Sequence, residues 1–208
     1  MKLTSQSIQQ GQAIDPKYAF AKQDPESHVA LSDNISPQFS WSDLPEGTQS
    51  LVMICTDTDA PSVADDANRE DKEVPADLER AEFYHWVLID IPSSTQELAE
   101  GEFSKGVTPK GKQGPAAPNG LRQGLNNFTQ WFANDQDMKG EYFAYDGPCP
   151  PFNDSLVHHY HFTLYALDIP KVNVEGSFDA PKVLEAIKSH VLAQDTITGT
   201  YTLNPRLS

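Results

Sequence analysis

Hydrophobic residues along the chain occur in short runs that have the spacing of β-strands. Residues 51–55 form a continuous apolar run, which predicts a strand buried on both faces. Residues 83–91 carry apolar side chains at both alternating positions, so we expect this strand inside a two-layer structure. Residues 160–167 predict a third strong strand. Phe39 and Trp41 lie on one face of a short edge strand predicted over residues 37–41.

The C-terminal part of the chain contains the one clear helical pattern. An apolar stripe at helical spacing predicts a helix over residues 180–193, with Asp179 as its N-cap. The stripe consists of Val183, Leu184, Ile187 and Val191. Threonines alternate with apolar side chains over residues 196–203, which is typical of a final strand. These elements predict a mainly β, antiparallel fold with a C-terminal helix.

Two long segments between the predicted strands have the composition of loops. Residues 65–82 hold eight acidic and three basic residues and almost nothing apolar, so we expect an acidic, solvated insertion at about 62–82. Residues 101–127 contain six glycines and three prolines, which predict a long irregular region. The aromatic-rich residues 128–145 are expected to fold back on the core. We expect a single domain over residues 1–208.

Composition and charge narrow the classes of partner. The 208 residues carry a net charge of −15, which argues against nucleic acid and against stable association with anionic membranes. No apolar run approaches the ~18 residues that cross a bilayer, and the first residues do not read as a signal peptide, so we expect a cytoplasmic protein. Cys55 and Cys149 are expected to be reduced thiols. Sixteen prolines argue against a helical bundle.

Two motifs suggest chemistry but lack the context that this chemistry requires. Residues 106–113 almost match a phosphate-binding loop, but Gln113 replaces the hydroxyl that binds Mg²⁺ and no helix can follow. His159 and His161 lie two apart on a strand, where two imidazoles can chelate zinc, but no spacing specifies a third ligand. We therefore predict neither a cofactor nor a metal.

A third set of residues is spread over several segments. Asp57 and Asp59 follow the first buried strand, and both would point the same way if that strand continued. Ala60-Pro61 then breaks the chain, and we expect a cis bond at this turn. His85 stands at the start of an apolar strand face, and residues 147–151 form a rigid loop with three prolines. His158 follows this loop and shares a strand face with Tyr160.

Together these segments resemble the phosphatidylethanolamine-binding protein family, which includes the Raf kinase inhibitor proteins and bacterial relatives. Four blocks carry the resemblance in the family's order, within residues 36–203. They are Ser36-Pro37 to Trp41 with Pro45-Glu46-Gly47-Thr48, Asp57-Thr58-Asp59-Ala60-Pro61, His85-Trp86-Val87-Leu88, and Gly147-Pro148-Cys149-Pro150-Pro151 through His158-His159-Tyr160.

The resemblance implies a two-sheet antiparallel β-sandwich with a small anion pocket at one end, which holds phosphate or phosphorylethanolamine-like groups. It also implies a homodimer, as is frequent among bacterial members. The ligand-binding positions are Asp57, Asp59, His85, Pro151, His158 and Tyr160. The supporting positions are Ala60 and Pro61, which are joined by a cis bond in the family, with Gly147 and Pro150.

This chain departs from the family pattern in three places. Six residues separate Pro151 from His158, about one more than is common, and His159 replaces the usual arginine. The acidic insertion and the region 101–145 are also larger than in compact members. Either of them could form a lid or an extra wall of the pocket.

The chemistry of these residues leaves three functions open. Two carboxylates alone repel phosphate, so a binding module needs an Asp that orients His85 or His158 toward phosphate, or an Asp that holds an ammonium group. Backbone N–H groups of the glycine-containing loop would supply further donors. The alternatives are a hydrolase that uses the histidines with Asp57, for which no nucleophile except Cys149 is evident, or an inhibitor of a kinase or protease.

Overall fold

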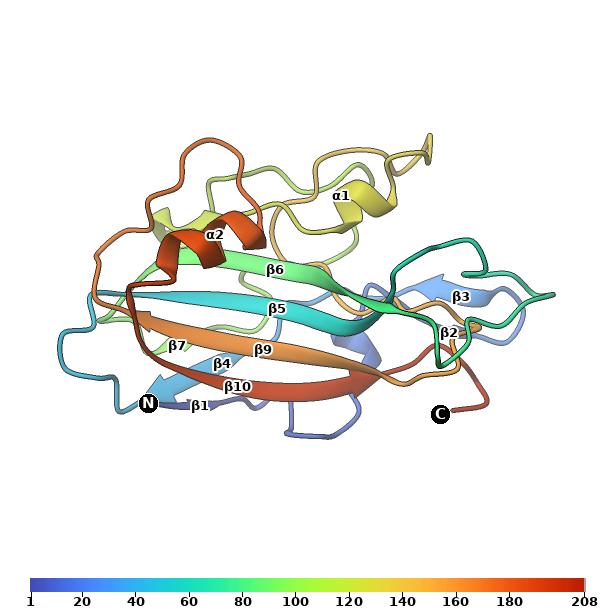
Figure 1. Ribbon diagram of the computed structural model, residues 1–208, viewed down its shortest axis with the longest axis horizontal. Coiled ribbons are helices and arrows are strands. Elements are labelled where there is room, and N and C mark those ends of the chain that lie inside the picture. The colour runs from blue at the N-terminus through green and yellow to red at the C-terminus, as the bar shows by residue number, and fades with distance from the viewer. Residues whose placement is uncertain (208) are drawn as a thin grey trace.

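The structure is a computed structural model that describes residues 1–207, and it is built mainly from antiparallel strands (Figure 1). The larger sheet has the order β10-β9-β5-β6-β8, and the smaller has the order β1-β4-β7. The larger sheet comprises β5 (Ser50–Pro61), β6 (Arg80–Pro92), β8 (Arg122–Gln123), β9 (His158–Leu167) and β10 (Val191–Tyr201). The smaller comprises β1 (Lys2–Thr4), β4 (Phe39–Ser42) and β7 (Glu97–Leu98).

Short elements complete the structure. A hairpin of β2 and β3 projects from one end (Figure 1). These elements are β2 (Ala21–Asp24), β3 (His28–Leu31), the helices α1 (Phe128–Trp131) and α2 (Ala180–Ile187), and the 3-10 helices η1 (Pro16–Tyr18) and η2 (Pro118–Gly120). No helix among residues 1–207 is long and apolar enough to cross a membrane.

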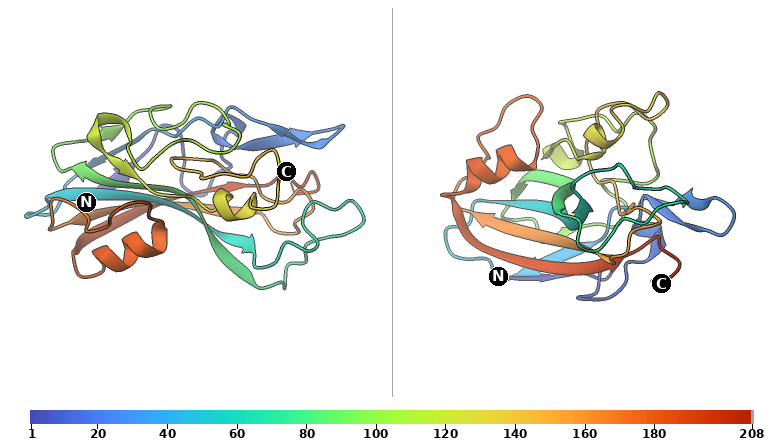
Figure 2. Two further views of the ribbon diagram at one scale, coloured as in Figure 1. Left: turned by 90° about the horizontal axis from the view of Figure 1, so that it is seen from above. Right: turned by 45° about the vertical axis from the view of Figure 1, so that its right-hand side comes forward.

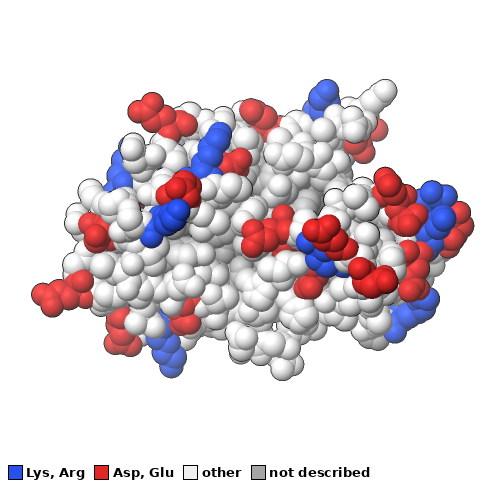
Figure 3. Space-filling view, viewed as in Figure 1, with Lys and Arg blue, Asp and Glu red and all other residues white. Residues whose placement is uncertain are grey.

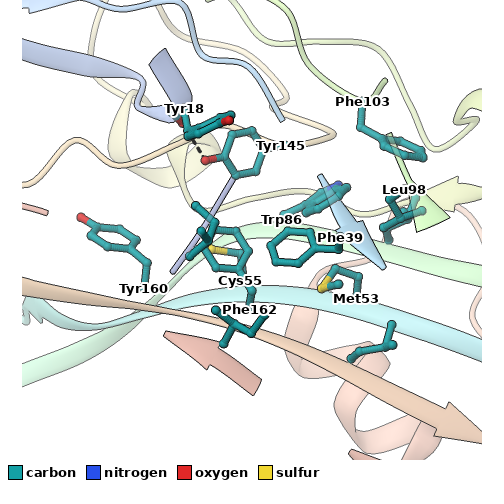
Figure 4. Close-up of a cluster of buried hydrophobic side chains, with 14 of the residues drawn as sticks. Tyr18, Phe39, Met53, Cys55, Trp86, Leu98, Phe103, Tyr145, Tyr160 and Phe162 are labelled. Atoms are coloured by element: carbon teal, nitrogen blue, oxygen red, sulfur yellow. Dashed lines mark hydrogen bonds between the residues drawn. The ribbon is translucent and has the colours of Figure 1, made fainter. Parts of the chain in front are cut away.

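The larger sheet is covered on both faces, as the view from above shows (Figure 2). On one face α2 packs through Val183 and Ile187 on apolar side chains of β5 and β6. On the other face lie the smaller sheet and the long loops, over a core that includes Phe39, Trp86 and Phe162 (Figure 4). Burial on both faces explains why the central residues of β5 (51–55) and of β6 (86–89) are all apolar.

The predicted fold class is confirmed, and three of its details are wrong. Residues 37–41 were expected at an edge, but β4 lies between β1 and β7. The C-terminal helix ends at Ile187, because the chain turns and Val191 then pairs with Leu167 in the larger sheet. The predicted helical stripe therefore includes Val191, a strand residue. Cys55 and Cys149 are both free thiols, as expected.

The acidic segment between β5 and β6 is more ordered than a solvated loop. It spans residues 62–79, since Arg80 already belongs to β6, and charges of both signs crowd this end of the molecule (Figure 3). The side chain of Asn153, only 5% exposed, donates to the carbonyls of residues 66, 69 and 72 and accepts from the Asn68 N–H. Val74 is buried. The Asn153 side chain thus links residues 66, 68, 69 and 72 of the loop.

The aromatic-rich segment 128–145 packs on the core as expected. Phe128, Tyr142, Phe143 and Tyr145 are buried, and Tyr145 donates its hydroxyl to the Tyr18 carbonyl at 2.6 Å (Figure 4). The preceding glycine-rich region is mostly irregular, but β8 pairs with β6 at the edge of the larger sheet. These contacts bring α1 to the end of the sheet where β5 and β6 meet the proline-rich loop.

We predict that Asn153→Ala loosens the acidic loop. The substitution removes the four hydrogen bonds of a buried amide, and the expected cost is about 1–3 kcal/mol of unfolding free energy. Urea unfolding measures this cost, and limited proteolysis should show faster cleavage within residues 62–79. Asn173→Ala, at an exposed amide, is the control. Unchanged proteolysis of the loop in Asn153→Ala would contradict the assignment.

Candidate functional site

A small, partly open pocket with a cavity volume of about 30 Å³ lies where β5, β6 and β9 meet the proline-rich loop. The pocket residues come from β5, β6, β9, α1 and the loop 147–151, so no single segment of the sequence forms the pocket. The lining consists of Asp57, Ala60, Pro61, Phe83, His85, Phe128, Trp131, Cys149, Pro150, Pro151 and His158. The fold thus brings most of the predicted site residues together.

His158 lies in this lining between two carboxylates. Its Nδ1 donates to Asp57 at 2.7 Å and its Nε2 donates to Asp154 at 3.1 Å, and the three side chains are almost fully buried. Arg80 binds the same Asp154 carboxylate with two hydrogen bonds of 2.7 and 3.1 Å. Two carboxylates and two cations therefore form one buried network. Both nitrogens of His158 are used within it.

This network holds His158 in its protonated form. Burial lowers the pKa of His158, but the hydrogen bonds to Asp154 and Asp57 outweigh burial and raise that pKa to about 9. Burial raises the pKa of Asp154, and here the hydrogen bonds from His158 and Arg80 prevail and lower it. His158 is consequently a cation near neutral pH, and its charge is balanced inside the protein.

His85 has the opposite character. It is 3% exposed. Burial lowers its pKa below the ordinary value and outweighs the nearby Asp57 carboxylate, which acts to raise that pKa. Its Nδ1 donates to the Asp146 carbonyl at 2.8 Å. Within residues 1–207 no hydrogen bond engages its Nε2. The imidazole is therefore neutral near pH 7 and presents one uncommitted nitrogen.

An aromatic wall faces these polar groups. Phe83 and Phe128 contact the His85 ring at centroid distances of 4.8 and 5.5 Å, and Trp131 is 38% exposed. Sequence reasoning did not place these three residues in the site. For Phe128 and Trp131 the one local signal is the aromatic richness of residues 128–145, which by itself indicates packing on the core, and Phe83 lies at the start of a predicted strand. Phe128 and Trp131 supply an extra wall, whereas residues 62–79 and 101–127 contribute nothing to the lining.

Asp59 lies away from the pocket lining. A bulge separates Asp57 from Ala60 in the pairing with β6, and the two aspartates contact successive residues of β9. Because successive strand residues point to opposite faces, Asp57 meets buried His158 and Asp59 meets half-exposed His159. The expectation that both aspartates point the same way is wrong. The Asp59 N–H still donates to Asp57 at 2.8 Å.

The peptide bond between Ala60 and Pro61 is trans, which corrects the cis bond expected from the family. Within residues 1–207 the cis X–Pro bond is the one between Gly114 and Pro115. The chain makes no tight turn after Asp59, because β5 continues in an extended conformation and pairs Ala60 and Pro61 with the first residues of β6. Both residues line the pocket as part of a strand.

The loop 147–151 offers few hydrogen-bond donors and contributes mainly to the shape of the pocket. Three of its residues are prolines, which have no N–H to donate. The Gly147 N–H donates to Asn34 at 2.8 Å, so it is not available to a ligand, contrary to the sequence-based expectation. A Cβ at Gly147 would overlap the Tyr18 carbonyl oxygen, which explains the glycine. Cys149 lines the pocket, but burial raises the pKa of its thiol to about 12.

Tyr160 is fully buried and is not among the residues that line the pocket. Its ring meets that of His85 at 5.2 Å, and its buried hydroxyl has no hydrogen-bond partner within the described residues. Burial raises the pKa of this hydroxyl well above its usual value. His159 and His161 share a face, as predicted. In the described part of the chain no three His, Cys, Asp or Glu residues are grouped to hold a metal.

The chain is similar to known proteins over most of its length. The family model described as phosphatidylethanolamine-binding protein matches residues 4–202. The chain is 28% identical over 201 residues to the UPF0098 protein YbhB of Escherichia coli, covering 97% of this chain and 99% of the relative. It is 33% identical over 177 residues to a UPF0098 protein of Methanothermobacter thermautotrophicus, covering 85% of this chain and 89% of the relative.

Two solved structures are similar over almost the whole chain. One is Escherichia coli YbcL, described as a new member of the mammalian PEBP family, with a TM-score of 0.68, 25% identity and 97% coverage of both chains. The other is a putative phosphatidylethanolamine-binding protein homologue, CT736 of Chlamydia trachomatis, with a TM-score of 0.63, 29% identity and coverage of 96% and 95%. This chain therefore belongs to the phosphatidylethanolamine-binding protein family.

Proposed function

We propose that the pocket binds a small phosphorylated ligand of the phosphorylethanolamine type, and that His85 is the residue that meets the phosphate. The carrying observation is the His85 Nε2, an uncommitted ring nitrogen in a pocket whose other imidazole is fully hydrogen-bonded. The family description names a phospholipid whose headgroup has this chemistry.

The charge balance of the pocket supports a ligand that carries both signs. Asp57 and Asp154 are neutralised by His158 and Arg80, and no lysine or arginine is among the described lining residues. A phosphate can therefore enter without meeting a net negative charge, and it gains a cationic partner when His85 takes up a proton. The His158 donors cannot serve the phosphate without leaving their carboxylates.

The aromatic wall supports the other end of such a ligand. Phe83, Phe128 and Trp131 present ring surfaces beside the Asp57 carboxylate. An ammonium group is attracted to aromatic faces and to carboxylates. In this proposal the phosphate of phosphorylethanolamine lies at His85 and its ammonium at this wall.

Two of the candidate catalytic groups, Cys149 and His158, are in states that favour binding over hydrolysis. The Cys149 thiol, with a pKa of about 12, is protonated at neutral pH and is a poor nucleophile. His158 is already protonated and held by two carboxylates, so it is not available as a general base.

We predict that O-phosphorylethanolamine and inorganic phosphate raise the melting temperature of the wild-type protein and not that of His85→Ala. A ligand at 100 times its dissociation constant adds about 2.7 kcal/mol of stability. Each variant is compared with its own unliganded melting temperature. His190→Ala, which removes a half-exposed histidine outside the pocket, should keep the wild-type response. Equal stabilisation of wild type and His85→Ala would exclude His85 as the phosphate partner, and no stabilisation of either would turn the search to protein partners.

We predict that anion affinity rises as the pH falls from 8 to 6. His158, with a pKa of about 9, is protonated at both values and contributes no change. The pKa of His85 is lowered in the free protein, so His85 is neutral at pH 8, and a bound anion favours its protonation. Calorimetry with sulfate, whose charge is constant over this range, isolates the response of the protein. His85→Ala should lose most of the dependence, and affinity that rises with pH would refute the mechanism.

A further inference from the structure

Asp146, whose backbone contacts His85, has a buried carboxylate that is held by three distant segments. The Asp146 side chain is 1% exposed. Lys112 Nζ and Asn34 Nδ2 donate to its Oδ1 at 2.7 and 2.8 Å, and Asn126 Nδ2 donates to its Oδ2 at 2.9 Å. Lys112 belongs to the near-match to a phosphate-binding loop. In this structure its ammonium is used inside the protein.

The backbone of Asp146 forms hydrogen bonds with both the ring and the backbone of His85. The Asp146 carbonyl accepts from His85 Nδ1 at 2.8 Å, and the Asp146 N–H donates to the His85 carbonyl at 3.1 Å. The first bond fixes the tautomer of the neutral imidazole, with the hydrogen on Nδ1 and the lone pair on Nε2. The position of Asp146 therefore decides which nitrogen remains for a ligand.

The same cluster reaches the aromatic wall and the proline-rich loop. Asn126 Oδ1 accepts from the Phe128 N–H at 3.0 Å, at the start of α1. Asn34 Oδ1 accepts from the Gly147 N–H at 2.8 Å, at the start of the loop 147–151. Two walls of the pocket thus depend on amides that also bind Asp146.

The Lys112 ammonium is the cation of this cluster. Burial raises the pKa of Asp146, and the Lys112 ammonium opposes that rise, together with the two amides. Without the ammonium, Asp146 either remains a buried unpaired charge or takes up a proton and can no longer accept from all its donors. In both cases the backbone at Asp146 loses its fixed position.

We propose that Lys112, through its buried pair with Asp146, is a positioning residue that holds His85 for the ligand. The consequence for ligand binding rests on the proposed function, whereas the consequence for His85 itself does not. The titratable groups that face His85 are Asp57 on β5 and His158 and Tyr160 on β9, and none of them contacts Lys112. A change at Lys112 therefore reaches His85 through Asp146.

The test compares Lys112→Met and Lys112→Arg with the wild type, and Lys105→Met is the control because it removes an exposed cation from the same region. Two quantities are measured well below the melting temperature of each variant. The first is the pKa of His85 in the free protein, by NMR of labelled histidine. The second is the affinity for O-phosphorylethanolamine, by calorimetry.

In Lys112→Met we expect water to reach His85, so that its pKa rises toward the ordinary value, and we expect roughly tenfold weaker binding, the loss of about one charge-assisted hydrogen bond. Lys112→Arg, which keeps the cation, should remain closer to wild type in both quantities, and Lys105→Met should match it. If Lys112→Met fails to fold, Lys112→Gln replaces it and should shift both quantities in the same direction.

A folded Lys112→Met with wild-type His85 pKa and wild-type affinity would overturn the inference, even if the variant unfolds more easily in urea. If the wild type itself does not bind O-phosphorylethanolamine, the proposed function fails. The His85 pKa in the free proteins then decides the positioning role alone: a shift in Lys112→Met supports it, and an unchanged pKa overturns it.

Discussion

The buried imidazolium of His158 between Asp57 and Asp154 is the interaction on which the pocket end of the structure depends. It joins β5 to β9 and to the loop that follows Pro151, and Arg80 extends it to the start of β6. Arg80 also donates to the carbonyls of Asp59 and Pro75. Since removal of one partner leaves a buried charge uncompensated, such networks are costly to break, by about 3–5 kcal/mol.

The two histidines of the pocket differ in protonation state. His158 is surrounded by carboxylates, so it is cationic and occupied, while His85 is surrounded by aromatic rings and a carbonyl, so it is neutral and available. The difference arises from environment alone, because both side chains are buried. Of the two histidines, His85 keeps a ring nitrogen free of hydrogen bonds, which is why the proposed function assigns the ligand to it.

The features that were predictable from the sequence are those with a local signal. Apolar runs identified β5, β6 and β9, and the family resemblance pointed to Asp57, His85, Pro151 and His158, which the structure brings to one pocket. The side-chain directions of Asp57 and Asp59 were not predictable, because one bulge in the pairing with β6 reverses the alternation.

Features that depend on partners distant in sequence left no signal. Arg80 and Asp154 lie 74 residues apart, and each looks like an ordinary surface charge when the sequence is read locally. Asn153 and Lys112 likewise gain their roles only from contacts with remote segments. Which of the long segments reaches the pocket is decided by tertiary packing.

The most direct test of this account is the protonation of the two histidines in the free wild-type protein, measured by NMR of the imidazole nitrogens from pH 5 to 10. The account predicts that His158 carries protons on both nitrogens at pH 7.5 and loses one near pH 9. It also predicts that His85 is neutral at pH 7.5, with its proton on Nδ1. A neutral His158 at pH 7.5, or a protonated His85, would contradict it.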